Sequence, residues 1–266
     1  GGPAGCALQP LPAGAVTPSA VLANLQQPEV VVAALRTALQ ALAAAGDEVS
    51  LLVPDLTARI AVLDFDALPG RREEIEAVAR FRLRKSLPFA EAQAVISCQV
   101  LSSTRLLVAL ADRARLDEYE DCLEAAGARA SLVLPSGLAA LASHAVLDHG
   151  GLLLRAEPGC LTTAFCWQGR VEFYRVLELS GAPVFDDVFP SVAYFRDRVE
   201  REAGHESGHW LLYSAGLEEG LNARLREEAP WAEWRSPEPP SVAAAGAAPT
   251  AGDMLAVTGA LRGRFS

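Results

Sequence analysis

Two spacings of apolar residues alternate along the first half of the chain and predict alternating helices and strands. A helix from Pro28 to Gly46 is predicted by apolar residues three to four positions apart, namely Val31, Leu35, Leu39 and Leu42. The same spacing predicts helices over Arg71–Leu87, Arg113–Ala126 and Gly137–Leu147, the last with Ser136 as its N-cap. Short apolar runs predict an edge strand and loop within Cys6–Val16 and strands at Val49–Val53, Ala58–Phe65, Ala94–Leu101, Arg105–Ala111 and Ala130–Leu134.

The second half begins with a predicted strand from Leu152, which enters a tight turn carrying Arg155, Glu157 and Pro158. The remaining predicted elements are the strands Leu161–Phe165 and Val171–Val176, a helix from the acidic pair Asp186-Asp187 through Val192, Phe195 and Val199 to near Gly204, a strand at Trp210–Tyr213, a helix through Leu217, Leu221 and Leu225, a flexible loop over Ser236–Gly252, and a short helix within Asp253–Arg262. Strands alternate with helices throughout, so the predicted fold class is α/β.

The composition narrows the class of protein. The 266 residues are 51% hydrophobic, enough for a sizeable core, and the net charge of -10 argues against non-specific nucleic-acid binding, which needs a positive field. A basic cluster stands out against this charge and consists of Arg80, Arg82, Arg84 and Lys85. We expect this cluster to be the solvated face of a helix, with anionic lipid headgroups or an acidic partner as the alternatives.

Cysteine spacing and chain ends add three expectations. The cysteines form no CxxC pair and have apolar neighbours, so we expect buried free thiols in a reducing cytoplasm at Cys6, Cys98, Cys122, Cys160 and Cys166. No run of about eighteen apolar residues predicts a membrane span. The chain begins with Gly1-Gly2-Pro3 and its only methionine is Met254, so we expect a fragment that lacks the residues before Gly1.

A series of short sequence segments between Val49 and Pro135 follows a distinctive order. They are the strand Val49–Pro54 with the following Arg59–Leu63, the amphipathic helix Glu73–Leu87 with its Pro88-Phe89 end, the strands Ser97–Leu101 and Leu106–Ala111, and the helix Tyr119–Gly127, which closes with LEAAG. In this order they resemble the PilM family of type IV pilus assembly proteins, which belongs to the actin-like superfamily. The resemblance covers nearly the whole chain and implies an actin-like (ribonuclease H-like), two-lobed α/β fold.

The resemblance also implies a division into domains. Residues 1–70 and 133–150 would form the first actin-like lobe without its N-terminal strands, and residues 71–132 a small inserted α/β subdomain. Residues 151–266 would form a reduced second lobe with a flexible loop at 236–252.

The chain departs from the family's pattern where a nucleotide would bind. The family's second phosphate loop has an aspartate followed two residues later by a glycine, and the matching positions here are Arg155 and Glu157. Its adenosine-side loop, usually Ser-Gly-Gly, is here Ser214-Ala215-Gly216. Together with Gly159, these residues form the degenerate nucleotide pocket that we predict.

The substitutions predict that the chain is not an enzyme. Mg²⁺ prefers carboxylate oxygens, whereas an arginine offers only donors and keeps its charge. We therefore expect no cofactor and no metal. The alternatives are an active ATPase that binds ATP and Mg²⁺, and a structural role in which Arg155 and Glu157 pair with each other, or with a neighbour, on an ordinary exposed turn.

The resemblance implies a function as well. The chain would be a cytoplasmic adaptor, peripheral at the inner membrane of a bacterium, in a type IV pilus or related assembly complex. In the PilM family, a groove between the first lobe and the inserted subdomain binds the cytoplasmic tail of PilN, a single-span membrane protein. From the segments Val49–Val53, Ala58–Phe65 and Glu73–Leu83, we expect the groove residues to be Val53, Ile60, Leu63, Ile75, Val78 and Leu83. The cytoplasmic part of a GspL-like type II secretion platform protein is a further alternative.

Other candidate motifs are weaker. His205 and His209 have the spacing of a zinc pair on a helix, but neighbouring glycines predict a loop there. We expect Trp231 and Trp234 to pack the base of the flexible loop onto the core, with a partner-binding patch as the alternative.

Overall fold

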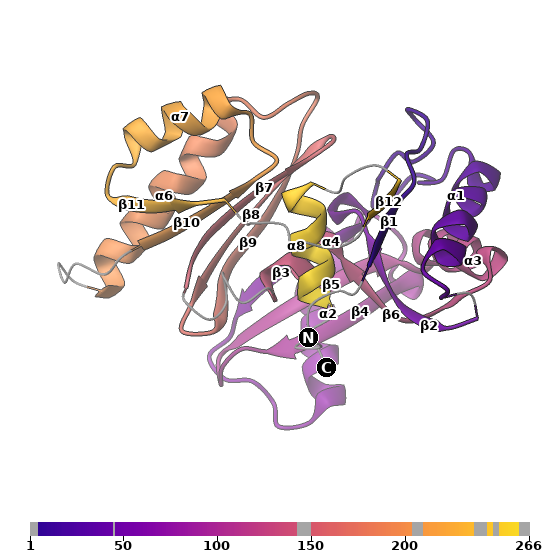
Figure 1. The fold of residues 1–266 in the computed structure, drawn as a ribbon. Helices are drawn as coiled ribbons and strands as arrows, with labels where there is room; N and C mark the ends of the chain where they lie inside the picture. Colours follow the sequence, from indigo (N-terminus) through magenta and orange to yellow (C-terminus); the bar gives the residue numbers. More distant parts are fainter. Residues whose placement is uncertain are drawn as a thin grey trace. The chain divides into compact units, whose positions relative to one another are not determined.

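The computed structural model describes residues 5–44, 46–142, 150–203, 210–236, 244–246 and 250–260. The chain forms two compact units, one from residues 1–138 and 240–249 and the other from residues 139–239 and 250–266 (Figure 1). The finer division of the first unit into a lobe and an inserted subdomain stays a prediction.

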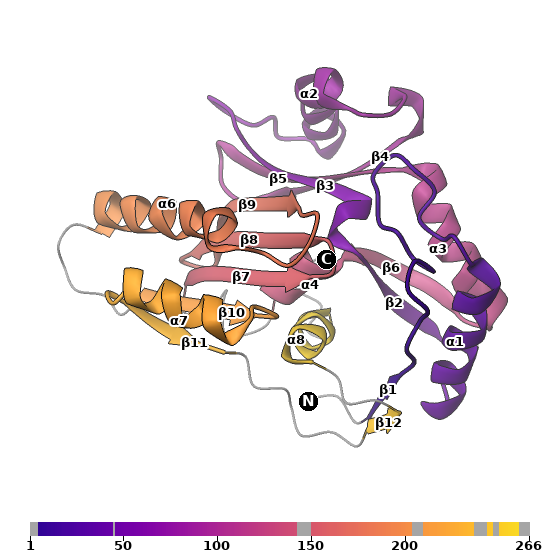
Figure 2. The same cartoon turned by 90° about the horizontal axis from the view of Figure 1, so that it is seen from above.

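A three-stranded antiparallel sheet in the first unit has the order β3-β5-β4, with the bounds Ala58–Asp64, Arg105–Asp112 and Ala94–Val100. Helix α2 (Arg72–Leu83) covers one face of this sheet, as Figure 2 shows. Ile75 and Ala79 of α2 pack there against alternate residues of β5, namely Leu106, Val108 and Leu110. The predicted helix over Arg71–Leu87 ends earlier than expected, because a separate 3-10 turn, Arg84–Ser86, follows Leu83.

The strands β2 (Glu48–Val53) and β6 (Arg129–Pro135) form a parallel pair covered by two helices, α1 (Pro28–Ala41) and α3 (Arg113–Ala126). The predicted bounds of α3 are confirmed at both ends. At its start, the side chain of Asp112 accepts a hydrogen bond from the backbone N–H of Ala114 at 3.2 Å. At its end, Gly127 has φ of 102°, a left-handed conformation that glycine adopts without strain.

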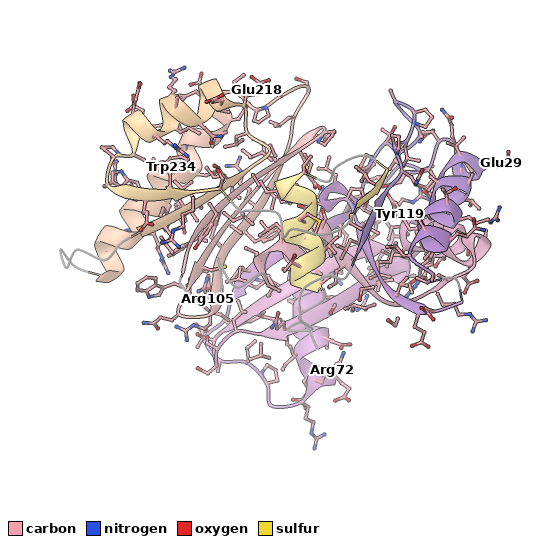
Figure 3. All side chains as sticks on the ribbon, viewed as in Figure 1. Glu29, Arg72, Arg105, Tyr119, Glu218 and Trp234 are labelled. Carbon is pink, nitrogen blue, oxygen red and sulfur yellow. The ribbon has the colours of Figure 1, made fainter. Side chains whose placement is uncertain are left out.

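A buried asparagine ties the N-terminal segment to the rest of the first unit. Asn24 Oδ1 accepts hydrogen bonds from the hydroxyls of Thr57 at 3.0 Å and Tyr119 at 3.1 Å. Its Nδ2 donates to the carbonyl oxygens of Ser19 and Leu22 at 2.7 and 2.8 Å. Because buried polar groups are costly unless they are hydrogen-bonded, this network fixes the loop around Asn24 against α3, where Figure 3 labels Tyr119.

The second unit is built on a mixed sheet with the strand order β11-β10-β7-β8-β9 within the described residues. The strands in sequence order are β7 (Gly151–Glu157), β8 (Cys160–Trp167), β9 (Arg170–Glu178), β10 (Trp210–Ala215) and β11 (Ala232–Arg235). Helices α6 (Phe185–Ala203) and α7 (Glu219–Glu228) pack on one face, where Leu152, Phe165 and Phe195 belong to a shared core (Figure 1). A last helix, α8 (Ala251–Ala260), contacts β7.

Two strands, β12 and β11, were not predicted from the sequence. β12 (Ala244–Gly246) lies inside the segment predicted to be a loop and pairs in parallel with the three-residue strand β1 (Cys6–Leu8). Alanine and glycine have little intrinsic strand preference, so β12 depends on its partner and has no local signal. The strand β11, Ala232–Arg235, was missed as well, because it has only four residues.

The predicted N-cap at Ser136 is wrong. Helix α4 (Ser136–Leu141) already includes this serine, and the carboxylate of Asp55 accepts a hydrogen bond from the backbone N–H of Gly137 at 2.6 Å. A capping group from a distant segment cannot be read from the local sequence. The predicted continuation of this helix to Leu147 lies outside the described residues.

The Asn24 network predicts a pH dependence of stability. Burial raises the pKa of Tyr119 to about 12, whereas an unfolded tyrosine has a pKa of about 10. The folded state therefore keeps this proton at a pH where the unfolded state releases it, so the stability is present below about pH 10 and is lost as the pH rises towards 12.

Urea unfolding between pH 9 and 12 would measure this effect, with Tyr119→Phe as the comparison. We expect the free energy of unfolding to fall more steeply for the wild type than for Tyr119→Phe. Parallel curves for the two proteins would contradict the assignment.

Candidate functional site

The structure brings together the two segments of the predicted nucleotide pocket. They lie at the carboxyl ends of the neighbouring parallel strands β7 and β10, where Ala215 is in register with Arg155 and Ser214 with Leu154. Open α/β sheets bind ligands at the carboxyl ends of their strands, so this is where a ligand site belongs in such a fold.

The sequence predicted Arg155 in a tight turn, but this residue lies within strand β7. Strand β7 continues to Glu157, which pairs with Cys160 of β8, and the turn consists of Pro158 and Gly159. The side chain of Arg155 is only 2% exposed. The strand predicted from Leu152 was too short at its C-terminal end, because the pairing with β8 extends β7 to Glu157.

Arg155 forms an ion pair with Glu157 in which its Nη2 donates to Glu157 Oε1. The two side chains share a face of the sheet because they are two residues apart on one strand. Glu157 is 24% exposed, so the pair joins a buried guanidinium to a carboxylate at the edge of solvent. The pairing that was considered as an alternative is present, but it lies at the end of a strand and not on an exposed turn.

Ser214 lies on the other face of the sheet. Its register partner, Leu154, belongs to the core beneath α6 and α7, whereas Arg155 is the next residue along β7. Ser214 Oγ is buried and has no hydrogen-bond partner in the described part of the chain. The hydroxyl and the guanidinium therefore do not converge on a shared ligand, although their backbones are adjacent.

Gly216 has a structural role directly after β10. Its φ is 75°, and a Cβ built on it would lie 2.3 Å from the carbonyl oxygen of Ala156 in β7. Gly159 has a similar φ of 81°, but a Cβ there would meet nothing within 4 Å. Close approach of backbone to backbone thus explains the glycine at 216, whereas turn conformation alone explains the glycine at 159.

The structure does not bring together the six predicted groove residues. Leu63, Ile75 and Leu83 pack into the core between α2 and its sheet. Ile60 lies on the opposite face of that sheet, because it is three residues from Leu63 on β3. Val53 is fully buried in a different sheet, and Val78 is half-buried on α2. Of the six residues, only Val53 and Ile75 are buried, and the other four are half-buried on different elements or faces.

The face of the sheet opposite α2 is apolar along β3, and the neighbouring Leu107 of β5 on this face is only 3% exposed. At one end of it, Ala58 and Ala111 pack against Leu116 of α3. Farther along β3, Ile60 and Val62 continue the same face and are half-buried. Among the predicted groove residues, Ile60 is thus placed on a surface distinct from the α2 core.

The predicted basic cluster lies at the C-terminal end of α2. Arg82, Arg84 and Lys85 are exposed, as expected for a solvated helix face. Arg80 differs, since its Nη1 donates to the carbonyl oxygen of Ala94 at 3.2 Å. Phe81, which the sequence analysis did not single out, is 73% exposed within this cluster. Its position off the buried stripe of α2 was the signal that could have identified it.

The tryptophan prediction is confirmed. Trp231 and Trp234 both pack against the core of the second unit, and Trp234 Nε1 donates to the carbonyl oxygen of Ala229 at 3.3 Å. Figure 3 labels Trp234 on β11, and the guanidinium of Arg226 in α7 lies 5.9 Å from its ring centroid. These contacts are those of core residues.

The remaining motifs give no site in the described residues. His205 and His209 lie outside these residues, and no cluster of metal-ligating side chains occurs within them. The cysteines are free as predicted, although Cys6 and Cys98 are only half-buried. None of the described helices combines the length and apolarity that a membrane crossing requires.

The comparison with known proteins identifies the fold. Neither a protein-family model nor a curated protein sequence matches the chain. A solved structure of the PilM-PilN type IV pilus biogenesis complex is similar at a TM-score of 0.70 and 15% identity, over 96% of this chain and 90% of that chain. The cytoplasmic domain of EpsL, an inner-membrane component of the type II secretion system of Vibrio cholerae, is similar at a TM-score of 0.52 and 15% identity, over 88% of this chain and 81% of that one.

The predicted fold class is confirmed by this comparison. The chain has the actin-like α/β fold that its resemblance to the PilM family implied. The TM-score of 0.70 establishes the fold, and at 15% identity the function has to be argued from the chemistry of the chain's own residues.

The two glycines of the site predict unequal effects on stability. Gly216→Ala places a Cβ against the carbonyl oxygen of Ala156, so the strands must separate, and we expect a loss of about 3–5 kcal/mol. Gly159→Ala has open space and is the matched control, with an expected loss of about 1 kcal/mol from its positive φ. Urea unfolding measures both, and equal losses would contradict the close approach of the strands.

Proposed function

We propose that this chain is a non-catalytic adaptor of a type IV pilus or related inner-membrane assembly complex. It acts at the cytoplasmic face of the membrane and binds the cytoplasmic tail of a single-span membrane partner similar to PilN. The similarity of its fold to a chain of the PilM-PilN complex, at a TM-score of 0.70, supports the setting. The buried ion pair of Arg155 with Glu157 is the observation that supports the absence of catalysis.

The chemistry of the ion pair is opposed to a magnesium nucleotide. A guanidinium cannot ligate a cation, and the carboxylate of Glu157 already accepts a hydrogen bond from it. Freeing Glu157 for magnesium would break this ion pair at a guanidinium that is only 2% exposed, which is unfavourable. The fold can thus be retained for its surfaces after its nucleotide chemistry has been lost.

The tail-binding surface that we propose is the apolar face of β3 that α2 leaves uncovered. In the described sheet, β3 is an edge strand, so its outer backbone groups are placed to pair with an extended peptide. Ile60 and Val62 then contact alternate side chains of that peptide. Strand addition of this kind takes affinity from backbone hydrogen bonds and specificity from the side chains.

A second candidate function is the cytoplasmic part of a type II secretion platform. The similarity to the cytoplasmic domain of EpsL favours it, but at a lower TM-score, 0.52 against 0.70. The two candidates differ in the membrane partner and share the adaptor role.

Binding of a synthetic peptide with the sequence of the partner's cytoplasmic tail tests the proposal. Ile60→Asp places a charge on the contact surface, and we expect it to weaken binding at least tenfold, or about 1.4 kcal/mol, in a calorimetric titration. Val100→Asp is the control, because Val100 is 53% exposed on β4 and lies outside the proposed surface. Substitutions at Ile75 or Leu83 are unsuitable, since a charge there enters the core.

The outcome is informative only for folded variants, so circular dichroism and thermal unfolding accompany each titration. Addition of Mg-ATP should leave the affinity for the peptide unchanged. Equal affinities of the wild type and Ile60→Asp would reject the surface, and absence of binding to the wild type would reject the partner.

A further inference from the structure

The C-terminal end of α2 presents an unusual combination of exposed side chains. Phe81 is 73% exposed, and the three residues Arg82, Arg84 and Lys85 around it are also exposed. The guanidinium of Arg84 lies 5.7 Å from the centroid of the Phe81 ring, so aromatic ring and cation belong to the same surface. We call Phe81, Arg82, Arg84 and Lys85 the α2 tip.

The exposure of Phe81 follows from how α2 packs. Ile75, Ala79 and Leu83 form the buried stripe that faces the sheet. Phe81 lies two positions from both Ala79 and Leu83, which places it on the opposite side of the helix. It cannot join the core without turning the stripe away from the sheet, so the fold itself directs an aromatic ring outwards.

The cations of the α2 tip are available to a partner. No ion pair of Arg82, Arg84 or Lys85 is found within the described residues, whereas Arg72 at the other end of α2 pairs with Glu76 at 3.1 Å. The protein as a whole is acidic, with a net charge of -10 that already includes these three cations. The α2 tip is therefore a local positive surface on a negative molecule.

We propose that the α2 tip binds an anionic lipid membrane. The ring of Phe81 enters the interface at the level of the headgroups, and the three cations contact phosphate groups beside it. Aromatic rings and basic residues are suited to this zone, which needs no preformed pocket for the ring. The acidic remainder of the surface is repelled by the same membrane, so the charge distribution favours approach with the α2 tip first.

A lipid surface fits these features better than an acidic protein does. A protein partner would need a cavity of matching shape for Phe81, whereas a bilayer interface accepts a projecting ring at any position. The cations follow one another within four residues and lie on the last turn of α2 and the 3-10 turn after it, which suits many equivalent phosphates. This proposal is independent of tail binding, because it concerns the chain alone.

The expected affinity is modest and depends on salt. Each basic residue near an anionic membrane surface raises the affinity about fivefold, so the three cations together contribute about 100-fold. Exposed charges are screened at high ionic strength, and binding should then decline strongly.

Co-sedimentation with vesicles tests the proposal directly. The vesicles are phosphatidylcholine alone, or phosphatidylcholine with about one third phosphatidylglycerol, at low and at high salt. We expect the chain to bind only the vesicles with phosphatidylglycerol and to be released by salt. The triple variant Arg82→Gln, Arg84→Gln and Lys85→Gln should lose about 100-fold in affinity, and Phe81→Ser should lose severalfold.

Control variants show whether membrane binding depends on residues of the α2 tip or only on the overall charge and apolarity of the protein. The triple variant Arg59→Gln, Arg129→Gln and Arg175→Gln removes the same charge from exposed residues elsewhere. Its affinity for the vesicles should fall much less than that of the triple variant in the α2 tip. Leu22→Ser removes an apolar side chain that is 70% exposed outside the α2 tip and should bind like the wild type.

Three outcomes would overturn the proposal. They are equal binding to both kinds of vesicle, equal losses in the two triple variants, and capture of a polyglutamate peptide without vesicle binding. The last result would assign the α2 tip to an acidic protein.

Discussion

The second unit depends on how one buried charge is satisfied. Arg155 lies inside β7 with almost no exposure, at the carboxyl end where an actin-like fold would bind a ligand. A guanidinium in such a position must be paired, and Glu157 provides the carboxylate. The carboxylate of Glu157, which a hydrated cation would need, is hydrogen-bonded to Arg155 in this pair. In the non-catalytic adaptor that we propose, this pairing also keeps Glu157 from coordinating a hydrated cation.

In the first unit, the two faces of the three-stranded sheet have different environments. One face of the three-stranded sheet is covered by α2, whose Ile75 and Leu83 pack against that face in a core. The other face carries Ile60, and the proposed contact with the partner's tail lies there. Because α2 uses its apolar stripe for the sheet, Phe81 remains outside and marks a separate surface. The two proposed contacts, with a peptide tail and with a membrane, therefore lie on different sides of one small helix–sheet layer.

Local signals in the sequence predicted much of this fold. Helix α3 was predicted at both ends, because apolar spacing and Gly127 are local features. Strand β12 was missed, since its three small residues are a strand only through pairing with β1. The burial of Arg155 was missed for a related reason, because only the register with β8 shows how far β7 extends. The groove prediction failed to separate Ile60 from Leu63, although alternation along a strand already places them on opposite faces.

The most direct test of the account is a calorimetric titration of Mg-ATP into the wild-type chain, with a crystal structure of the chain soaked in a non-hydrolysable ATP analogue. The account predicts no saturable heat up to about millimolar nucleotide, the concentration at which binding is worth about 4 kcal/mol. It also predicts an unchanged contact between Arg155 and Glu157 in the soaked crystal. Micromolar affinity, with ordered triphosphate beside Arg155, would contradict it.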